Sequence, residues 1–147
     1  MNECDSSDIN RTPAFHITIR SCRNEVDRAV GQIIGLLQTL PCTGEALDEI
    51  ELALSEALAN AIIHGNHEDP AKKVDICASC EGEKTLLLVI TDQGQGFDPA
   101  ALPDPTAAEN LPLTLGRGVF LMSRLMGQVE YRLGGRQVVL RRSKGAQ

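Results

Sequence analysis

The feature that most constrains this chain is a long amphipathic helix, whose second half we predict in residues 51–66. Apolar residues recur along it at spacings of three and four, which is the periodicity of a helix with one buried face. They are Leu47, Ile50, Leu54, Leu58, Ala61 and Ile62. Gly65 then supplies a stop, because glycine is the residue that most readily ends a helix. The pattern therefore predicts a helix of the hydrophobic core that ends near Gly65.

Three polar residues on this helix, Glu56, Asn60 and His64, lie four positions apart and so form one row along its surface. We call them the helix row. The row runs close to the apolar stripe, where a carboxylate or an amide is costly to bury without a partner. From these three residues alone, a polar ridge between helix and solvent is the simpler interpretation. A functional interpretation depends on motifs further along the chain.

Length and charge restrict the class of protein. The 147 residues suit one domain, which we expect at residues 13–143, with a disordered leader at 1–12 and a short tail at 144–147. The net charge of −6 and the scattered basic residues argue against a nucleic-acid partner. No apolar run is long enough for a membrane span, and the polar N-terminus lacks the apolar core of a signal peptide. These features predict a cytoplasmic chain with no membrane partner.

The five cysteines are an odd number without the spacing of a disulfide framework, so we expect reduced thiols. Cys77 and Cys80 form a CxxC pair, but no second pair with zinc-like spacing accompanies it. Positions three apart on a strand also face opposite sides of the sheet. A metal-binding or redox role for this pair is therefore disfavoured.

The remaining elements define the fold class. Periodicity and turn residues predict strands at 15–19, 74–78, 85–91, 129–133 and 137–141, and further helices at 24–40 and 116–127. Residues 81–84 form the turn of one hairpin, and Gly134-Gly135 that of another. We therefore predict an α+β two-layer sandwich, with three helices on one face of a mixed, mostly antiparallel five-stranded sheet. The pattern does not determine the strand order.

Two glycine motifs carry the candidate chemistry. Asp92-Gln93-Gly94-Gln95-Gly96 follows an apolar strand, so its carboxylate can accept a hydrogen bond from an exocyclic amine while the glycines admit a ligand to the backbone. Gly116-Arg117-Gly118 precedes a helix predicted to begin near Val119, where backbone amides and the helix dipole can bind phosphate. Each motif is common in ordinary turns, so neither is decisive alone.

A long segment with several prolines and few apolar residues separates the two motifs. Connections of this length inside compact domains are usually functional, which predicts a lid at residues 98–115. Such a segment makes few contacts to offset its ordering entropy, so we expect it to be mobile without ligand.

The order of these pieces is specific: Glu56-x-x-x-Asn60 on a helix, Asp92-x-Gly94-x-Gly96 after a strand, then Gly116-x-Gly118 after the lid. This set resembles the nucleotide-binding domain of the GHKL superfamily over residues 15–142. Residues 55–66, SEALANAIIHGN, followed by Asp69-Pro70, look like the anti-sigma-factor serine kinases in particular. The resemblance implies the Bergerat sandwich fold and a magnesium ATP ligand.

Residue roles follow from the same resemblance. Glu56 would be the general base that polarises the attacking hydroxyl, and Asn60 would hold Mg²⁺ through its amide oxygen. Asp92 would bind the adenine amine. The remaining implied contacts are Gly94 and Gly96 at the adenine pocket, Gly116 and Gly118 around the phosphates, and Arg117 at the γ-phosphate. For Arg117, a solvated side chain is the alternative.

The chain departs from the family pattern at two positions. His67 stands where a lysine is frequent, although Lys72 and Lys73 follow closely and either could contact phosphate. Arg136 stands where many members have a threonine after the last hairpin glycine, which puts one hydroxyl contact near adenine in doubt.

The resemblance implies an ATP-dependent protein serine kinase that phosphorylates a serine on a STAS-domain antagonist, with a sigma factor or other regulator as a further partner. A homodimer is compatible with the sequence. One alternative is a non-catalytic ATP-binding module that sequesters its regulator. Another is an ATPase that drives movement, which would need a transducer domain.

Overall fold

The computed structural model describes residues 13–96 and 113–144, and only the backbone for residues 113–117. The expected leader, most of the expected lid and the last three residues lie outside this range. The described helices are α1 (Val26–Leu37), preceded by a 3₁₀ turn at Arg23–Glu25, α2 (Leu47–Ala59), continued by a π-helix at Asn60–Gly65, and α3 (Leu113–Met126). None of these helices is long and apolar enough to cross a membrane.

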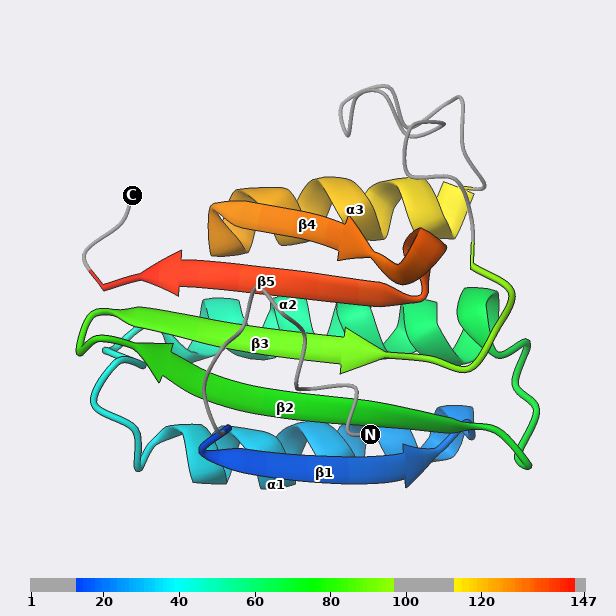
Figure 1. The fold of residues 1–147 in the computed structure, drawn as a ribbon, viewed down its shortest axis with the longest axis horizontal. Coiled ribbons are helices and arrows are strands. Elements are labelled where there is room, and N and C mark those ends of the chain that lie inside the picture. Colours follow the sequence, from blue (N-terminus) through cyan, green and yellow to red (C-terminus); the bar gives the residue numbers. More distant parts are fainter. Residues whose placement is uncertain (1–12, 97–112, 145–147) are drawn as a thin grey trace.

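The strands are β1 (Phe15–Arg20), β2 (Lys73–Glu81), β3 (Thr85–Thr91), β4 (Gln128–Arg132) and β5 (Gln137–Ser143). They form one sheet in the order β1-β2-β3-β5-β4, and all four pairings are antiparallel. The three helices lie behind this sheet in Figure 1 and cover one of its faces. The predicted α+β sandwich is thus confirmed, although the sheet is wholly antiparallel instead of mixed, and β3 is its central strand.

The hydrophobic core lies between the helices and the sheet. Along β2 and β3, alternate side chains face the helices and pack against the apolar stripe of α2. The fully buried members include Ile50, Leu54, Leu58, Ile62, Ile76, Leu88 and Ile90. The intervening residues form a second, smaller cluster of Cys77, Leu87, Val89 and Val139, and alternation assigns it to the opposite face. Burial on both faces explains why β3 is a continuous apolar run.

Helix α3 begins earlier than the sequence predicted. It starts at Leu113, before both the predicted range 116–127 and the start near Val119 expected from the glycine motif, so Gly116-Arg117-Gly118 lies within the helix and not in a turn before it. Glycine in a helix costs about 1 kcal/mol relative to alanine. Packing of the buried Val119, Met122 and Met126 within the core offsets this cost, and tertiary burial prevails over local propensity.

The prediction of reduced cysteines is wrong for Cys42, Cys77 and Cys80, which are disulfide-bonded. Cys42, in the α1–α2 connection, forms a disulfide with Cys80 on β2, with a Cα–Cα distance of 5.7 Å. The two are 38 residues apart, and only the packing of that connection against the sheet brings them together. The expected opposite orientation of the CxxC pair is confirmed, because Cys80 packs against the main core and Cys77 belongs to the second cluster.

Candidate functional site

The helix that carries the helix row changes its geometry at the site. After Ala59 the chain continues as a π-helix, and the backbone N–H of Asn66 donates to the carbonyl of Ala61 at 2.8 Å, an i to i−5 bond. Single π turns within α-helices occur frequently at functional sites. Glu56 therefore lies on the α-helical part of the predicted row, whereas His64 lies inside the π-helix.

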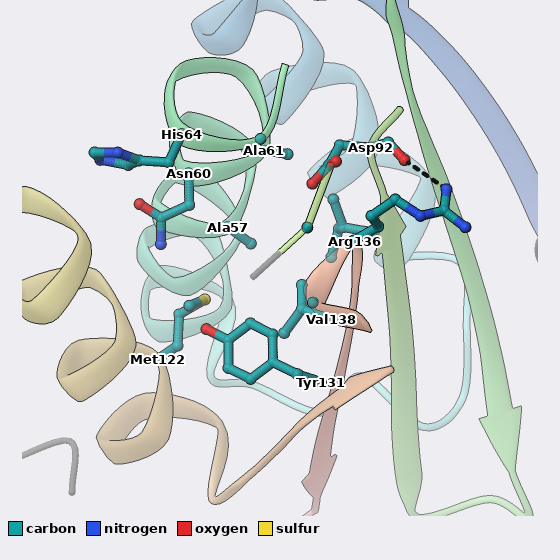
Figure 2. A pocket seen from close by; sticks show the side chains of 13 residues that line it. Ala57, Asn60, Ala61, His64, Asp92, Met122, Tyr131, Arg136 and Val138 are labelled. Carbon is teal, nitrogen blue, oxygen red and sulfur yellow. Dashed lines mark hydrogen bonds between the residues drawn. The ribbon is translucent and has the colours of Figure 1, made fainter. Parts of the chain in front are cut away.

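A pocket opens beside this turn, at the end of the sheet where β3 stops and β4 turns into β5 (Figure 2). It contains about 470 Å³ of empty space, including the part open to solvent. The lining residues are Ala57, Asn60, Ala61, His64, Gly65, Ile90, Asp92, Gly96, Met122, Tyr131, Gly135, Arg136 and Val138. Apolar walls from both layers therefore surround a few polar groups.

Glu56, Asn60 and Gly118 meet next to this pocket. A Cβ atom on Gly118 would lie 2.8 Å from Nδ2 of Asn60 and 3.1 Å from Oε2 of Glu56. Helix α3 can therefore approach the helix row this closely only with glycine at position 118. The Asn60 Nδ2 atom is buried and finds no hydrogen-bond partner among the described residues. Buried polar atoms are normally paired, so Asn60 has unused hydrogen-bonding capacity beside the pocket.

Asp92 lies at the base of the pocket, directly after β3, and only 6% of its surface is exposed. The backbone N–H of Gly94 donates to its Oδ1 at 2.8 Å, and its own N–H donates to the Arg136 carbonyl at 2.9 Å. Burial raises the pKa of the Asp92 carboxyl above its ordinary value. The Gly94 amide opposes this shift, as do the charges of Arg136, Lys72 and His67. Asp92 is thus a desolvated acceptor beside a cavity, which is a frequent property of functional carboxylates.

Three glycines permit close backbone approaches around Asp92. A Cβ on Gly65 would lie 2.4 Å from Oδ2 of Asp92, and one on Gly94 would lie 1.9 Å from the Gly65 carbonyl oxygen. Gly96 has a φ of +79°, and a Cβ there would lie 2.1 Å from the Gly134 carbonyl oxygen. The end of the π-helix, the loop after β3 and the β4–β5 turn therefore pack closely together, and at Gly94 and Gly96 an added Cβ would collide with backbone.

The structure brings six sequence-predicted residues to this region: Glu56, Asn60, Asp92, Gly94, Gly96 and Gly118. Gly116 and Arg117 lie in the first turn of α3, within the stretch described by its backbone alone, so a γ-phosphate contact by Arg117 stays a prediction. The expected lid at 98–115 lies outside the described residues, except for its last three positions, which are helical.

Sequence reasoning missed several residues of the pocket. Met122 and Tyr131 form part of its wall (Figure 2), and burial raises the pKa of Tyr131 to about 12. Helical spacing in α3 and alternation in β4 could have marked both as inward-facing, but neither pattern identifies a ligand site. Gly65 was interpreted only as a helix stop, and its contact with Asp92 has no local sequence signal.

The chain is similar in sequence to known proteins. Residues 22–143 match the family model of the histidine kinase-like ATPase domain. An anti-sigma F factor from Anoxybacillus flavithermus (strain DSM 21510 / WK1) is 35% identical over 100 residues, which are 66% of this chain and 67% of that protein. An anti-sigma F factor from Heyndrickxia coagulans is 32% identical over 119 residues, 79% of each chain.

A third relative, an anti-sigma F factor from Bacillus cytotoxicus (strain DSM 22905 / CIP 110041 / 391-98 / NVH 391-98), is 36% identical over 101 residues, which are 67% of this chain and 68% of that protein. Among solved structures, the histidine kinase domain of the Erythrobacter litoralis EL346 blue-light activated histidine kinase is 20% identical, with a TM-score of 0.48, over 79% of this chain and 58% of that one.

Proposed function

Because this chain belongs to the histidine kinase-like ATPase domain family, within the branch of the anti-sigma F factors, we propose that it is an ATP-dependent protein serine kinase and partner-switching regulator. One observation carries the proposal. Glu56 and Asn60 meet Gly118 of α3 next to a pocket whose base holds the buried carboxylate of Asp92. A group suited to base recognition thus lines the pocket, and a group suited to proton transfer lies next to it.

The base of ATP would occupy the end of the pocket at Asp92. Oδ1 already accepts from Gly94, so Oδ2 is the oxygen with capacity for the exocyclic amine of adenine. Ile90, Met122 and Val138 supply apolar wall for the ring. Partly desolvated hydrogen bonds to a carboxylate are stronger than those between neutral groups, so this contact would contribute much of the affinity for the base.

The phosphates would lie toward Asn60 and Gly118. Gly118 lies in the second turn of α3, next to the first turn, where the positive partial charge of a helix N-terminus favours anions. Gly116 and Arg117 of the same helix end would contribute further phosphate contacts. The first turns of α3 would therefore bind the phosphates, the function that the sequence predicts for a glycine-rich turn before the helix.

The Asn60 site fits a magnesium ion. Mg²⁺ takes oxygen ligands and usually keeps waters and substrate phosphate oxygens, so one protein amide can suffice. In the described part of the chain, no group of three or more His, Cys, Asp or Glu side chains is arranged to hold a metal, which agrees with such a sparse protein contribution. The amide nitrogen of Asn60 has no hydrogen-bond partner among the described residues. Rotation of the amide group by 180° would place its oxygen at the same position, where it could bind Mg²⁺. When bound, Mg²⁺ would neutralise charge on the phosphate oxygens.

Glu56 would act on the protein substrate. Its carboxylate accepts the proton of the substrate serine hydroxyl while the serine oxygen forms a bond to the γ-phosphorus. The bond between that phosphorus and the bridging oxygen breaks, and ADP leaves with the electron pair.

We propose a serine on a STAS-domain antagonist as the acceptor and a sigma factor or similar regulator as the second partner. Phosphate on that serine would add charge to the antagonist's interface and weaken its hold.

Transfer of labelled γ-phosphate from Mg-ATP to a purified STAS-domain antagonist tests this function. Glu56→Gln should still bind ATP while transfer falls about 10²- to 10⁴-fold, the usual contribution of a general base. Glu51→Gln is a matched control, because Glu51 is exposed on the same helix, and its rate should be native. Native transfer by Glu56→Gln would reject the general-base role. A native chain that binds ATP without transferring phosphate would instead be a non-catalytic module.

A further inference from the structure

Asn66 is a fully buried polar residue near the pocket, and its side chain joins three separate segments. Its Nδ2 donates to the Ser21 hydroxyl and, at 3.0 Å, to the Lys73 carbonyl. Its Oδ1 accepts from the backbone N–H of Gln93 at 2.8 Å. Both amide hydrogens and the carbonyl are therefore used, and no part of the side chain is exposed.

Each partner stands at the end of a strand. Ser21 follows β1, Lys73 is the first residue of β2, and Gln93 comes two positions after β3. The side chain of Gln93 adds a second tie, because its Oε1 accepts from the backbone N–H of Lys73 at 2.7 Å. The loop after β3 is thus held at one residue by both its backbone and its side chain.

Gln93 lies in the sequence between Asp92 and Gly94. The N–H of Gly94 donates to the Asp92 carboxylate at the base of the pocket. Gly65, the residue before Asn66, packs directly against the same carboxylate. The end of the π-helix therefore contacts the Asp92 loop at two points. The Gly65 backbone packs against Asp92, and the Asn66 side chain binds the backbone of Gln93.

Asn66 does not line the pocket and is fully buried, and its polar side-chain atoms are already hydrogen-bonded within the chain, so any role in binding is indirect. We infer that Asn66 is a positioning residue for base recognition, whose buried amide holds the Gln93 backbone so that Asp92 presents its carboxylate to the exocyclic amine of a purine. The inference rests on the proposed function, because it assumes that Asp92 contacts the base. It differs from a purely structural role in that loss of Asn66 should reduce discrimination between bases and leave phosphate binding unchanged.

Calorimetry with three ligands separates these roles: Mg-ATP, Mg-purine riboside triphosphate, which lacks the exocyclic amine, and magnesium tripolyphosphate, which lacks base and sugar. The native chain should prefer ATP over the analogue by about 10-fold or more, the range for a hydrogen bond to a charged group. In Asn66→Ala this preference should fall to within about threefold of unity, with tripolyphosphate affinity unchanged. Thr43→Val is the matched control, because Thr43 is a buried, hydrogen-bonded residue in the α1–α2 connection, and it should keep the native preference.

A folded Asn66→Ala that keeps the native preference for ATP would overturn the inference and leave the proposed function intact. A native chain without that preference would reject base recognition by Asp92, and the inference with it. If Asn66→Ala does not fold, Asn66→Ser keeps a hydroxyl for one of the buried partners, and the same loss of preference is expected from it. Retention of the preference in folded Asn66→Ser would equally overturn the inference.

Discussion

Replacing Gly65 by alanine should weaken ATP binding about 10- to 150-fold without disturbing the backbone. Gly65 is not among the described residues with positive φ, so alanine can adopt its conformation. The new Cβ would nevertheless lie 2.4 Å from Oδ2 of Asp92, whereas ordinary contact begins at 3.4 Å, so the carboxyl group must retreat by about 1 Å. That movement would cost the hydrogen bond to the base. One hydrogen bond to a charged group contributes about 1.5–3 kcal/mol, which corresponds to the stated range of affinity.

Isothermal titration with Mg-ATP measures this effect, and Gly35→Ala provides the control. Gly35 lies in α1, where an added Cβ meets nothing within 4 Å. Its replacement should leave ATP affinity unchanged and raise the free energy of unfolding by about 0.8–1 kcal/mol through helix propensity. If Gly65→Ala bound ATP as tightly as the native chain, the position of the Asp92 carboxylate would not matter for the ligand, and the assignment of the base site would fail.

Three further perturbations are informative. Gly118→Ala should reduce phosphate transfer about 10-fold with little change in stability, because the added Cβ would displace the flexible side-chain ends of Glu56 and Asn60. A native transfer rate would contradict the proposed roles of these two residues. Burial raises the pKa of Asp92 in the folded state, so stability is lost as pH rises from 3.8 through the folded-state pKa. Asp92→Asn should therefore abolish tight ATP binding yet raise the free energy of unfolding at pH 7, with a gain that shrinks as pH falls toward 3.8 in urea titrations. A less stable Asp92→Asn at pH 7 would refute this. Joint replacement of Cys42 and Cys80 by alanine should lower the free energy of unfolding by up to about 4 kcal/mol, because the disulfide closes a 38-residue loop and so restricts the unfolded chain. Replacement of the free Cys22 by serine should change the free energy of unfolding little. Equal urea midpoints for both variants would show that the disulfide is not stabilising.

Local spacing in the sequence was sufficient to predict the elements and the order of the motifs. The four-residue interval between Glu56 and Asn60 determines their common side of a helix, and the apolar run before Asp92 identifies it as the end of a central strand. These properties depend on residues near one another in the chain, which is why the sandwich and the candidate groups could be predicted before any contact was known.

Contacts between distant segments were decided only by the tertiary structure. The start of α3, the disulfide of Cys42 with Cys80, and the position of Gly65 against Asp92 each depend on where another element packs. Asn66 illustrates the difference: the sequence places an asparagine after a helix stop, but its three hydrogen bonds exist only because the ends of β1, β2 and β3 converge on it. A buried amide needs hydrogen-bond partners, and these can come from any part of the chain. The spacing of residues along one helix or strand does not indicate which groups of other elements will lie next to it.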